Sequence, residues 1–144
     1  MTIAPVVKTL ELSCSVEHAF TVFTQRMATW WPLATHSIAG VNAESVTVEG
    51  EVGGRIVERA SDGSEHVWGT ILIWEPPTRL AFTWHPGRDA SSAQHVEVRF
   101  ESGTSTTVTL THKGWEKLGD EAQTHRDGYD SGWDGVLADY VGAI

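Results

Sequence analysis

Hydrophobic and polar residues alternate along much of the chain, and this period of two is typical of β-strands with one buried face. Turn signals separate the alternating segments, among them Gly53-Gly54, Asp62-Gly63 and Ser102-Gly103. Clean alternation suits an antiparallel sheet with one face toward water. The predicted strands cover residues 6–12, 45–49, 55–59, 67–74, 79–84, 96–101 and 106–111.

Helical spacing of apolar residues replaces the alternation in two places. Ser15 has the side chain of a helix N-cap, and the short apolar stripe after it predicts a helix that one more turn over residues 27–31 continues. Pro32 ends that turn because a residue before proline disfavours helix. Residues 33–44 show no period and predict a long loop, which in a compact domain often binds a ligand.

A longer stripe runs over residues 128–144 and predicts a C-terminal helix about 25 Å long at 1.5 Å per residue. Four glycines weaken this helix in isolation, so we expect tertiary packing to hold it and the glycines to admit neighbouring backbone. The apolar members of the stripe are Tyr129, Trp133, Val136, Leu137, Tyr140 and Val141.

The order of elements defines the fold class. A strand, two short helices, about six strands and a long helix predict an α+β domain that spans residues 1–144. A curved antiparallel sheet must cover its apolar face, and the last helix is the element long enough to lie across it. We therefore expect a space between the C-terminal helix and the sheet, with the 33–44 loop and Trp30-Trp31 at its mouth.

Composition and charge narrow the classes of function. The net charge of −9 makes nucleic acid a poor partner. No segment approaches the roughly 20 apolar residues of a membrane span, and the start of the chain lacks a signal-peptide pattern. Cys14 is the single cysteine, so no internal disulfide can form. We expect a soluble, cytoplasmic protein.

Candidate chemistry is sparse. The seven histidines show no recognised metal spacing, and neither a phosphate loop nor a dinucleotide fingerprint occurs, so we expect no metal and no cofactor. We expect His112 and His125 to face the interior. Cys14 precedes the first predicted helix, where a structural, inert thiol is the simpler interpretation.

Aromatic side chains carry the main functional hypothesis. Seven tryptophans are many for 144 residues, and aromatic rings give a binding cavity large apolar faces. The same rings could instead fill the core, since each buried ring covers about 150–250 Å². We expect Trp74 and Trp115, near strand ends, to anchor loops. The candidate ligand-binding residues are Trp30, Trp31, Trp68, Phe82, Trp84, Tyr129 and Trp133.

Several motifs, in order along almost the whole chain, carry a family resemblance. They include the capped first helix, Trp30-Trp31-Pro32, the block from Glu75 to Trp84 with its Pro-Pro-x-Arg-Leu, and the late Gly132-Trp133. The chain resembles the helix-grip superfamily of START domains and the major birch-pollen allergen. Within it, the chain is similar to stand-alone bacterial members related to the C-terminal domain of the Hsp90 ATPase activator.

The resemblance implies a cavity rather than one activity. Our first hypothesis is binding of a small apolar molecule, lipid-like or aromatic, between sheet and C-terminal helix. The second is a protein-interaction module like that of the Hsp90 activator. The third is a cyclase- or hydrolase-type enzyme, which needs a polar residue in the pocket; the sequence offers only His112, His125 and Tyr129 and so favours binding over catalysis.

Overall fold

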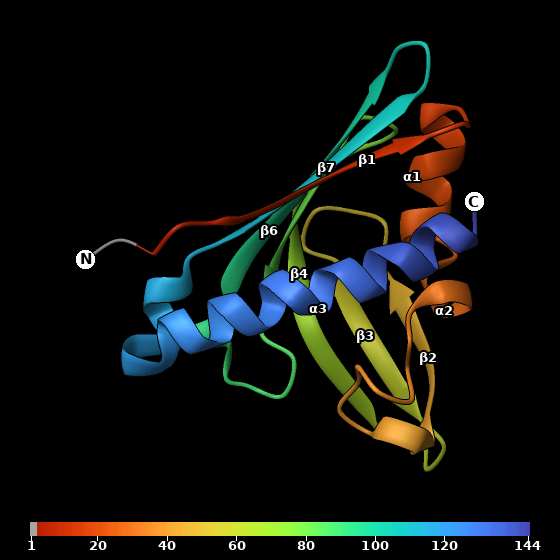
Figure 1. Cartoon of the computed structure of the whole chain (residues 1–144). Coiled ribbons are helices and arrows are strands. Elements are labelled where there is room, and N and C mark those ends of the chain that lie inside the picture. Colours follow the sequence, from red (N-terminus) through yellow and green to blue (C-terminus); the bar gives the residue numbers. More distant parts are fainter. Residues whose placement is uncertain (1–2) are drawn as a thin grey trace.

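Seven antiparallel strands form one sheet in the order β1-β7-β6-β5-β4-β3-β2 in the computed structural model, which describes residues 3–144. The sheet curls around the long C-terminal helix α3 (Figure 1). The strands are β1 (Val6–Leu12), β2 (Ala43–Val48), β3 (Arg55–Ala60), β4 (Glu65–Glu75), β5 (Arg79–Trp84), β6 (Gln94–Ser102) and β7 (Thr106–Lys113).

The helices follow the predicted order. Two short helices come after β1, and α3 closes the chain and crosses the concave side of the sheet (Figure 1). The Ser15 hydroxyl caps the first helix by accepting a hydrogen bond from the His18 amide at 3.1 Å. The helices are α1 (Val16–Thr24), α2 (Met27–Trp30) and α3 (Ala122–Gly142), with 3-10 turns η1 (Gly40–Asn42), η2 (Ala90–Ser92) and η3 (Trp115–Glu121).

The predicted α+β helix-grip fold is confirmed, and so is the inward direction of the alternating residues. Val96, Val98 and Phe100 of β6 are all buried, as are Val108 and Leu110 of β7. These side chains form the core between the sheet and the helices, because antiparallel pairing in register brings their faces together.

Two details of the C-terminal helix were predicted wrongly. It begins at Ala122, six residues before the expected start at residue 128. Val141, expected in the buried stripe, is 43% exposed.

The expected role of the helix glycines is also wrong. A Cβ added at Gly128, Gly132, Gly135 or Gly142 would meet no atom within 4 Å outside the helix's own backbone, so these glycines do not admit a neighbouring backbone. The helix is instead held by its buried aromatic residues and by charges.

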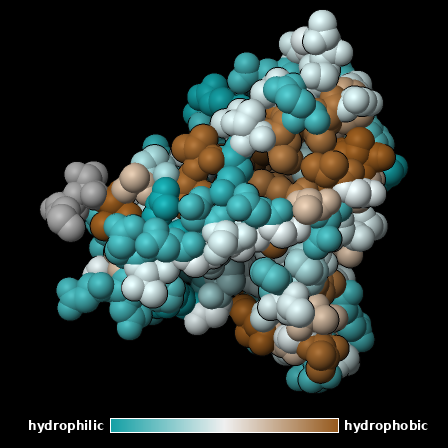
Figure 2. All heavy atoms as spheres, viewed as in Figure 1, coloured by the Kyte–Doolittle hydropathy of each residue, from teal (hydrophilic) through white to brown (hydrophobic). Residues whose placement is uncertain are grey.

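Charged contacts attach α3 to the edge strand β1. The Lys8 ammonium lies 2.8 Å from Asp130 and 3.0 Å from Asp134. The side chains of Asp130 and Asp134 are 43% and 68% exposed. Figure 2 shows a largely hydrophilic surface along α3. On the buried face, the Tyr140 hydroxyl donates to the Ala19 carbonyl oxygen at 2.7 Å and so joins α3 to α1.

One glycine determines how closely β4 approaches β5. A Cβ at Gly69 would overlap the carbonyl oxygen of Thr83, so only glycine fits there. The pairing of β3 with β4 shifts register beside this residue, between Ile56 and Val57. Such irregularities bend a sheet, and here the irregularity lies opposite Thr83, next to the last residue of β5.

Candidate ligand-binding site

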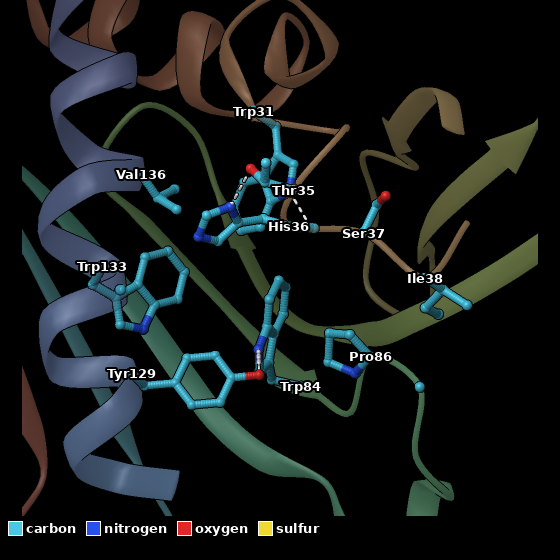
Figure 3. Close-up of a pocket in the computed structure, with 12 residues that line it drawn as sticks. Trp31, Thr35, His36, Ser37, Ile38, Trp84, Pro86, Tyr129, Trp133 and Val136 are labelled. Carbon is cyan, nitrogen blue, oxygen red and sulfur yellow. Dashed lines mark hydrogen bonds between the residues drawn. The ribbon is translucent and has the colours of Figure 1, made fainter. Parts of the chain in front are cut away.

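A pocket of about 410 Å³ opens between α3, the loop after α2 and the end of β5. Figure 3 shows the lining side chains converging on it from these three parts of the chain. The volume falls within the range of small-molecule sites. The lining residues are Trp31, Thr35, His36, Ser37, Ile38, Trp84, Pro86, Gly87, Tyr129, Gly132, Trp133 and Val136.

Three tryptophans form the aromatic wall of the pocket. The ring centroids of Trp31, Trp84 and Trp133 lie 5.8 to 6.0 Å from one another. None of the three pairs is stacked face to face, because interplanar angles run from 41° to 82°. Trp31 is 8% exposed and Trp84 and Trp133 are each 2% exposed, so each ring borders the pocket with a small part of its surface.

The N–H groups of these indoles are already engaged by the protein. Trp31 donates to the His36 carbonyl oxygen at 2.7 Å, and Trp133 donates to the Nδ1 atom of His112 at 3.0 Å. Trp84 donates to the Tyr129 hydroxyl oxygen at 3.3 Å (Figure 3). The ring surface that borders the pocket is therefore apolar, because the three donors are used inside the protein.

Of the seven side chains named from the sequence, four line the pocket: Trp31, Trp84, Tyr129 and Trp133. Trp30, Trp68 and Phe82 are buried in the core and do not line it. Trp68 supports the wall from behind, with its ring centroid 5.1 Å from that of Trp31.

Trp115 and Trp74 pack outside the pocket. Trp115 is fully buried and stacks on His112 at a centroid distance of 4.0 Å, where it holds η3 against β7. Trp74 is half-buried and packs edge-on against Phe20 at 5.1 Å. Both belong to structural contacts at strand ends.

His112 faces the interior, as expected, yet it stands behind the pocket wall. Its Nδ1 atom accepts from Trp133, which leaves the proton on Nε2 to face the side-chain oxygen of Gln94 at 3.3 Å. Burial lowers the pKa of His112 to about 3, so the ring is neutral at neutral pH. It positions Trp133 rather than touching a ligand.

His125 does not face the interior, contrary to expectation. Its side chain is 30% exposed, and its Nε2 atom lies 3.2 Å from Glu121 and 2.8 Å from the Arg88 guanidinium. This polar contact belongs to the surface beside the pocket. It offers no group to a ligand inside.

Glu58 is a central residue that the sequence interpretation missed. Its fully buried carboxylate accepts from the amides of Ile38 and Ala39, both at 2.7 Å, and from the Trp68 indole at 2.9 Å. It thus fixes the pocket-lining loop to β3. The sequence could have indicated this position, because Ile56, Glu58 and Ala60 alternate along the strand and therefore point to the same, buried face of the sheet.

His36 was also missed as a lining residue. Its Nδ1 atom lies 2.7 Å from the Thr35 hydroxyl, and its ring covers the side of the pocket next to Val136 and Trp133 (Figure 3). Its place in the predicted mouth loop was the available signal.

Within residues 3–144, the side chains of His, Cys, Asp and Glu form no cluster of three or more that could hold a metal ion. Over the same residues, no helix is long and apolar enough to cross a membrane. Burial raises the pKa of the Cys14 thiol, the opposite of an activated nucleophile.

The curled sheet, the long helix across it and the pocket between them together define a helix-grip protein. The family model described as Activator of Hsp90 ATPase homolog 1-like protein matches residues 13–142, and the chain belongs to this family. Among curated proteins, none matches the chain by sequence.

Solved structures agree with this assignment. The chain is 37% identical to the anthrahydroquino-γ-pyrone synthase Txn09, with a TM-score of 0.67 and coverage of 99% of this chain and 98% of the synthase. It is 16% identical to Aha1 from Colwellia psychrerythraea, solved as a dimer, with a TM-score of 0.71 and coverage of 99% and 96%. Protein MLL2253 from Mesorhizobium loti is 17% identical, with a TM-score of 0.69 and coverage of 96% and 94%.

Proposed function

We propose that this protein binds a flat, largely aromatic small molecule in the pocket between α3 and the sheet. The observation that carries the proposal is an open pocket of about 410 Å³ that Trp31, Trp84 and Trp133 line, with the N–H groups of all three used inside the protein. A core-filling role would not require that volume. The likeness to a synthase of fused aromatic pyrones supports the same ligand class.

The shape of the site favours aromatic over long-chain ligands. The pocket is bordered by rings at several angles, and stacking and edge contacts favour a rigid planar ligand. A flexible chain would lose rotational freedom on binding and would gain no such contacts.

A matched pair of variants tests the proposal. Gly132 lines the pocket, whereas Gly135 lies one turn of α3 further on and is exposed; a Cβ at either meets no atom within 4 Å beyond the helix backbone. Native mass spectrometry of freshly purified protein looks for a co-purifying aromatic molecule. We expect Gly132→Leu to lose it and Gly135→Leu to keep it.

The same pair is titrated with the planar tricycle 9-fluorenone, followed by tryptophan fluorescence. We expect at least tenfold weaker binding for Gly132→Leu alone. Equal binding by both variants, or no binding by the unaltered protein to any planar tricycle, contradicts the proposal.

A second candidate is an enzyme that closes a ring on such a ligand. The specific observation in its favour is the 37% identity to the pyrone synthase over nearly the full length of both chains. Incubation of the protein with a mixture of open and cyclised aromatic ketones, followed by mass and retention analysis, tests it. Turnover by the unaltered protein but not by Gly132→Leu is the expected result for an enzyme.

A third candidate, from another class, is a protein-interaction role, which the description of the matching family favours. This role would use an outer surface rather than the pocket. Capture of Hsp90 at physiological salt, equally by the unaltered protein and Gly132→Leu, is its expected result. No capture, together with a ligand in the pocket, decides against it.

A further inference from the structure

The two tyrosines of the chain stand in opposite hydrogen-bonding states. Tyr140 donates its hydroxyl proton to the Ala19 carbonyl oxygen at 2.7 Å, so that proton is used inside the core. Tyr129 lines the pocket, and its hydroxyl oxygen receives the Trp84 N–H at 3.3 Å. An indole nitrogen is a donor only, so Tyr129 is necessarily the acceptor in this bond.

The proton of the Tyr129 hydroxyl is consequently not used in the hydrogen bond with Trp84. Among residues 3–144 the hydroxyl donates to no protein acceptor, and because Tyr129 is half-buried at an open pocket, water can serve it until a ligand displaces that water. Burial raises the pKa of this phenol above its ordinary value, so it keeps its proton at neutral pH. The Trp84 N–H occupies one lone pair of the Tyr129 oxygen and so restricts the direction of the Tyr129 O–H. The hydroxyl is therefore a preorganised donor and does not rotate freely.

The other polar groups of the lining are committed elsewhere. The Ser37 hydroxyl bonds the Leu33 carbonyl oxygen and receives the Gly40 amide. The Thr35 hydroxyl contacts His36 at 2.7 Å. The remaining nitrogen of the His36 ring belongs to an exposed residue at the rim, where water can serve it. In Figure 3 the His36 ring and the Tyr129 hydroxyl lie toward opposite ends of the aromatic cluster.

We propose that Tyr129 is the specificity-determining hydrogen-bond donor of this pocket. The ligands it selects are planar aromatic ketones or quinones, whose carbonyl oxygen accepts a hydrogen bond from the Tyr129 hydroxyl. This inference rests on the proposed ligand site. A hydrocarbon of the same shape would leave the hydroxyl dehydrated and unpaired, and a site built around a donor rejects such a ligand.

The size of the discrimination follows from one neutral hydrogen bond. Such a bond contributes about 0.5–1.5 kcal/mol net, which corresponds to roughly three- to tenfold in affinity. The aromatic wall should contribute equally to both kinds of ligand, so the ratio of two affinities isolates the contribution of the hydroxyl.

The test uses 9-fluorenone and fluorene, which differ only in that a carbonyl group of fluorenone stands in place of a methylene group of fluorene. The ratio of their dissociation constants is measured by tryptophan fluorescence in the unaltered protein, in Tyr129→Phe and in the matched control Tyr140→Phe. We expect the preference for fluorenone to fall about three- to tenfold in Tyr129→Phe and to stay unchanged in Tyr140→Phe.

A second measurement does not depend on the folding of a variant. The carbonyl stretching band of 9-fluorenone bound to the unaltered protein is compared with its band in an apolar solvent. We expect a shift to lower wavenumber, as a hydrogen-bonded carbonyl shows. An unshifted band overturns the inference.

The remaining outcomes separate this inference from the proposed function. Binding of both probes with the same ratio in all three proteins overturns the role of Tyr129 and leaves the pocket in place. Binding of neither probe overturns the proposed function, and this inference with it.

Discussion

Single residues hold the rim of the pocket. Glu58 accepts three N–H bonds and forms no ion pair with any of residues 3–144, and two of its donors, Ile38 and Ala39, belong to the loop that borders the site. A buried carboxylate is costly unless its oxygens are satisfied, so this residue and the loop stabilise each other. A substitution at the rim of the pocket should therefore change the free energy of unfolding of the protein.

Glu58→Gln tests this dependence. The amide keeps the size of the side chain but replaces one acceptor with a donor, which then faces an N–H. We expect a loss of about 1–3 kcal/mol in the free energy of unfolding by urea, and faster hydrogen exchange at the amides of Ile38 and Ala39. Glu75→Gln, at an exposed carboxylate, is the control and should leave both quantities unchanged. Equal behaviour of the two variants would contradict the role given to Glu58.

His112 makes stability depend on pH. Its pKa is about 3 in the folded protein, because burial disfavours the charged ring, and near 6.5 in the unfolded chain. The unfolded state therefore binds more protons between these values, and stability falls as the pH drops below 6.5.

We expect the folded protein to lose up to about 1.4 kcal/mol per pH unit from this residue between pH 6 and 4. His112→Gln removes that contribution while all other titrating groups stay the same. Urea unfolding at pH 7, 6 and 5 gives the comparison. If both proteins show the same pH slope, His112 is not the buried neutral base described.

At the scale of elements, α3 combines a well-anchored buried face with a weak backbone. Trp133, Leu137 and Tyr140 are buried, whereas Gly128 and Gly135 face solvent. Glycine in a helix interior costs up to about 1 kcal/mol relative to alanine. Nothing around these two positions requires glycine.

Gly135→Ala is expected to stabilise the protein by about 0.5–1 kcal/mol, because the new methyl group meets open space and the helix gains propensity. Chemical denaturation measures the change. Gly114→Ala is the control with opposite sign, since Gly114 has a φ of 87° that alanine adopts only with strain. A loss of stability in Gly135→Ala would show that the helix backbone is packed after all.

The elements could be predicted from the sequence where the period of apolar residues was strong. Alternation located the seven strands, and Ser15 located the start of α1. The start of α3 was missed because residues 122–127 are almost all polar and carry no apolar stripe. That turn directly follows η3, which the stacking of Trp115 on His112 holds against β7, and such tertiary packing is not contained in the local pattern.

The site could be predicted only in part for a similar reason. Alternation assigns a side chain to the inner face, but it gives no depth, so Trp68 and Trp84 looked equivalent. The depth depends on partners remote in sequence: Glu58 takes the N–H of Trp68 into the core, whereas Tyr129 takes that of Trp84 at the pocket. These pairings exist only once the sheet has curled.

At the scale of the whole molecule, the curvature of the sheet creates the volume under α3. Gly69 permits β4 to approach the Thr83 carbonyl oxygen at the point where the strand pairing becomes irregular. A side chain there would push the strands apart and flatten the sheet near the pocket mouth.

Gly69→Ala is therefore expected to destabilise the protein by about 1–3 kcal/mol or more, as overpacking does, and to weaken fluorenone binding in the fraction that folds. Gly103→Ala, where the nearest atom to an added Cβ is 3.5 Å away, serves as the control. Thermal unfolding followed by circular dichroism measures the first effect, and fluorescence titration the second. A neutral Gly69→Ala would mean that the sheet can relax around the added methyl group.

The ring-to-ring spacing has an optical consequence. Trp31, Trp68 and Trp84 have centroids 5.1 to 5.8 Å apart, and Trp133 lies 5.9 Å from Trp84. At such separations the electronic transitions of neighbouring indoles couple, so excitation is shared among them and the group absorbs polarised light as one chiral chromophore. These coupled indoles lie at the proposed ligand site. A change in their exciton couplet in circular dichroism during a titration would therefore report ligand binding without any label.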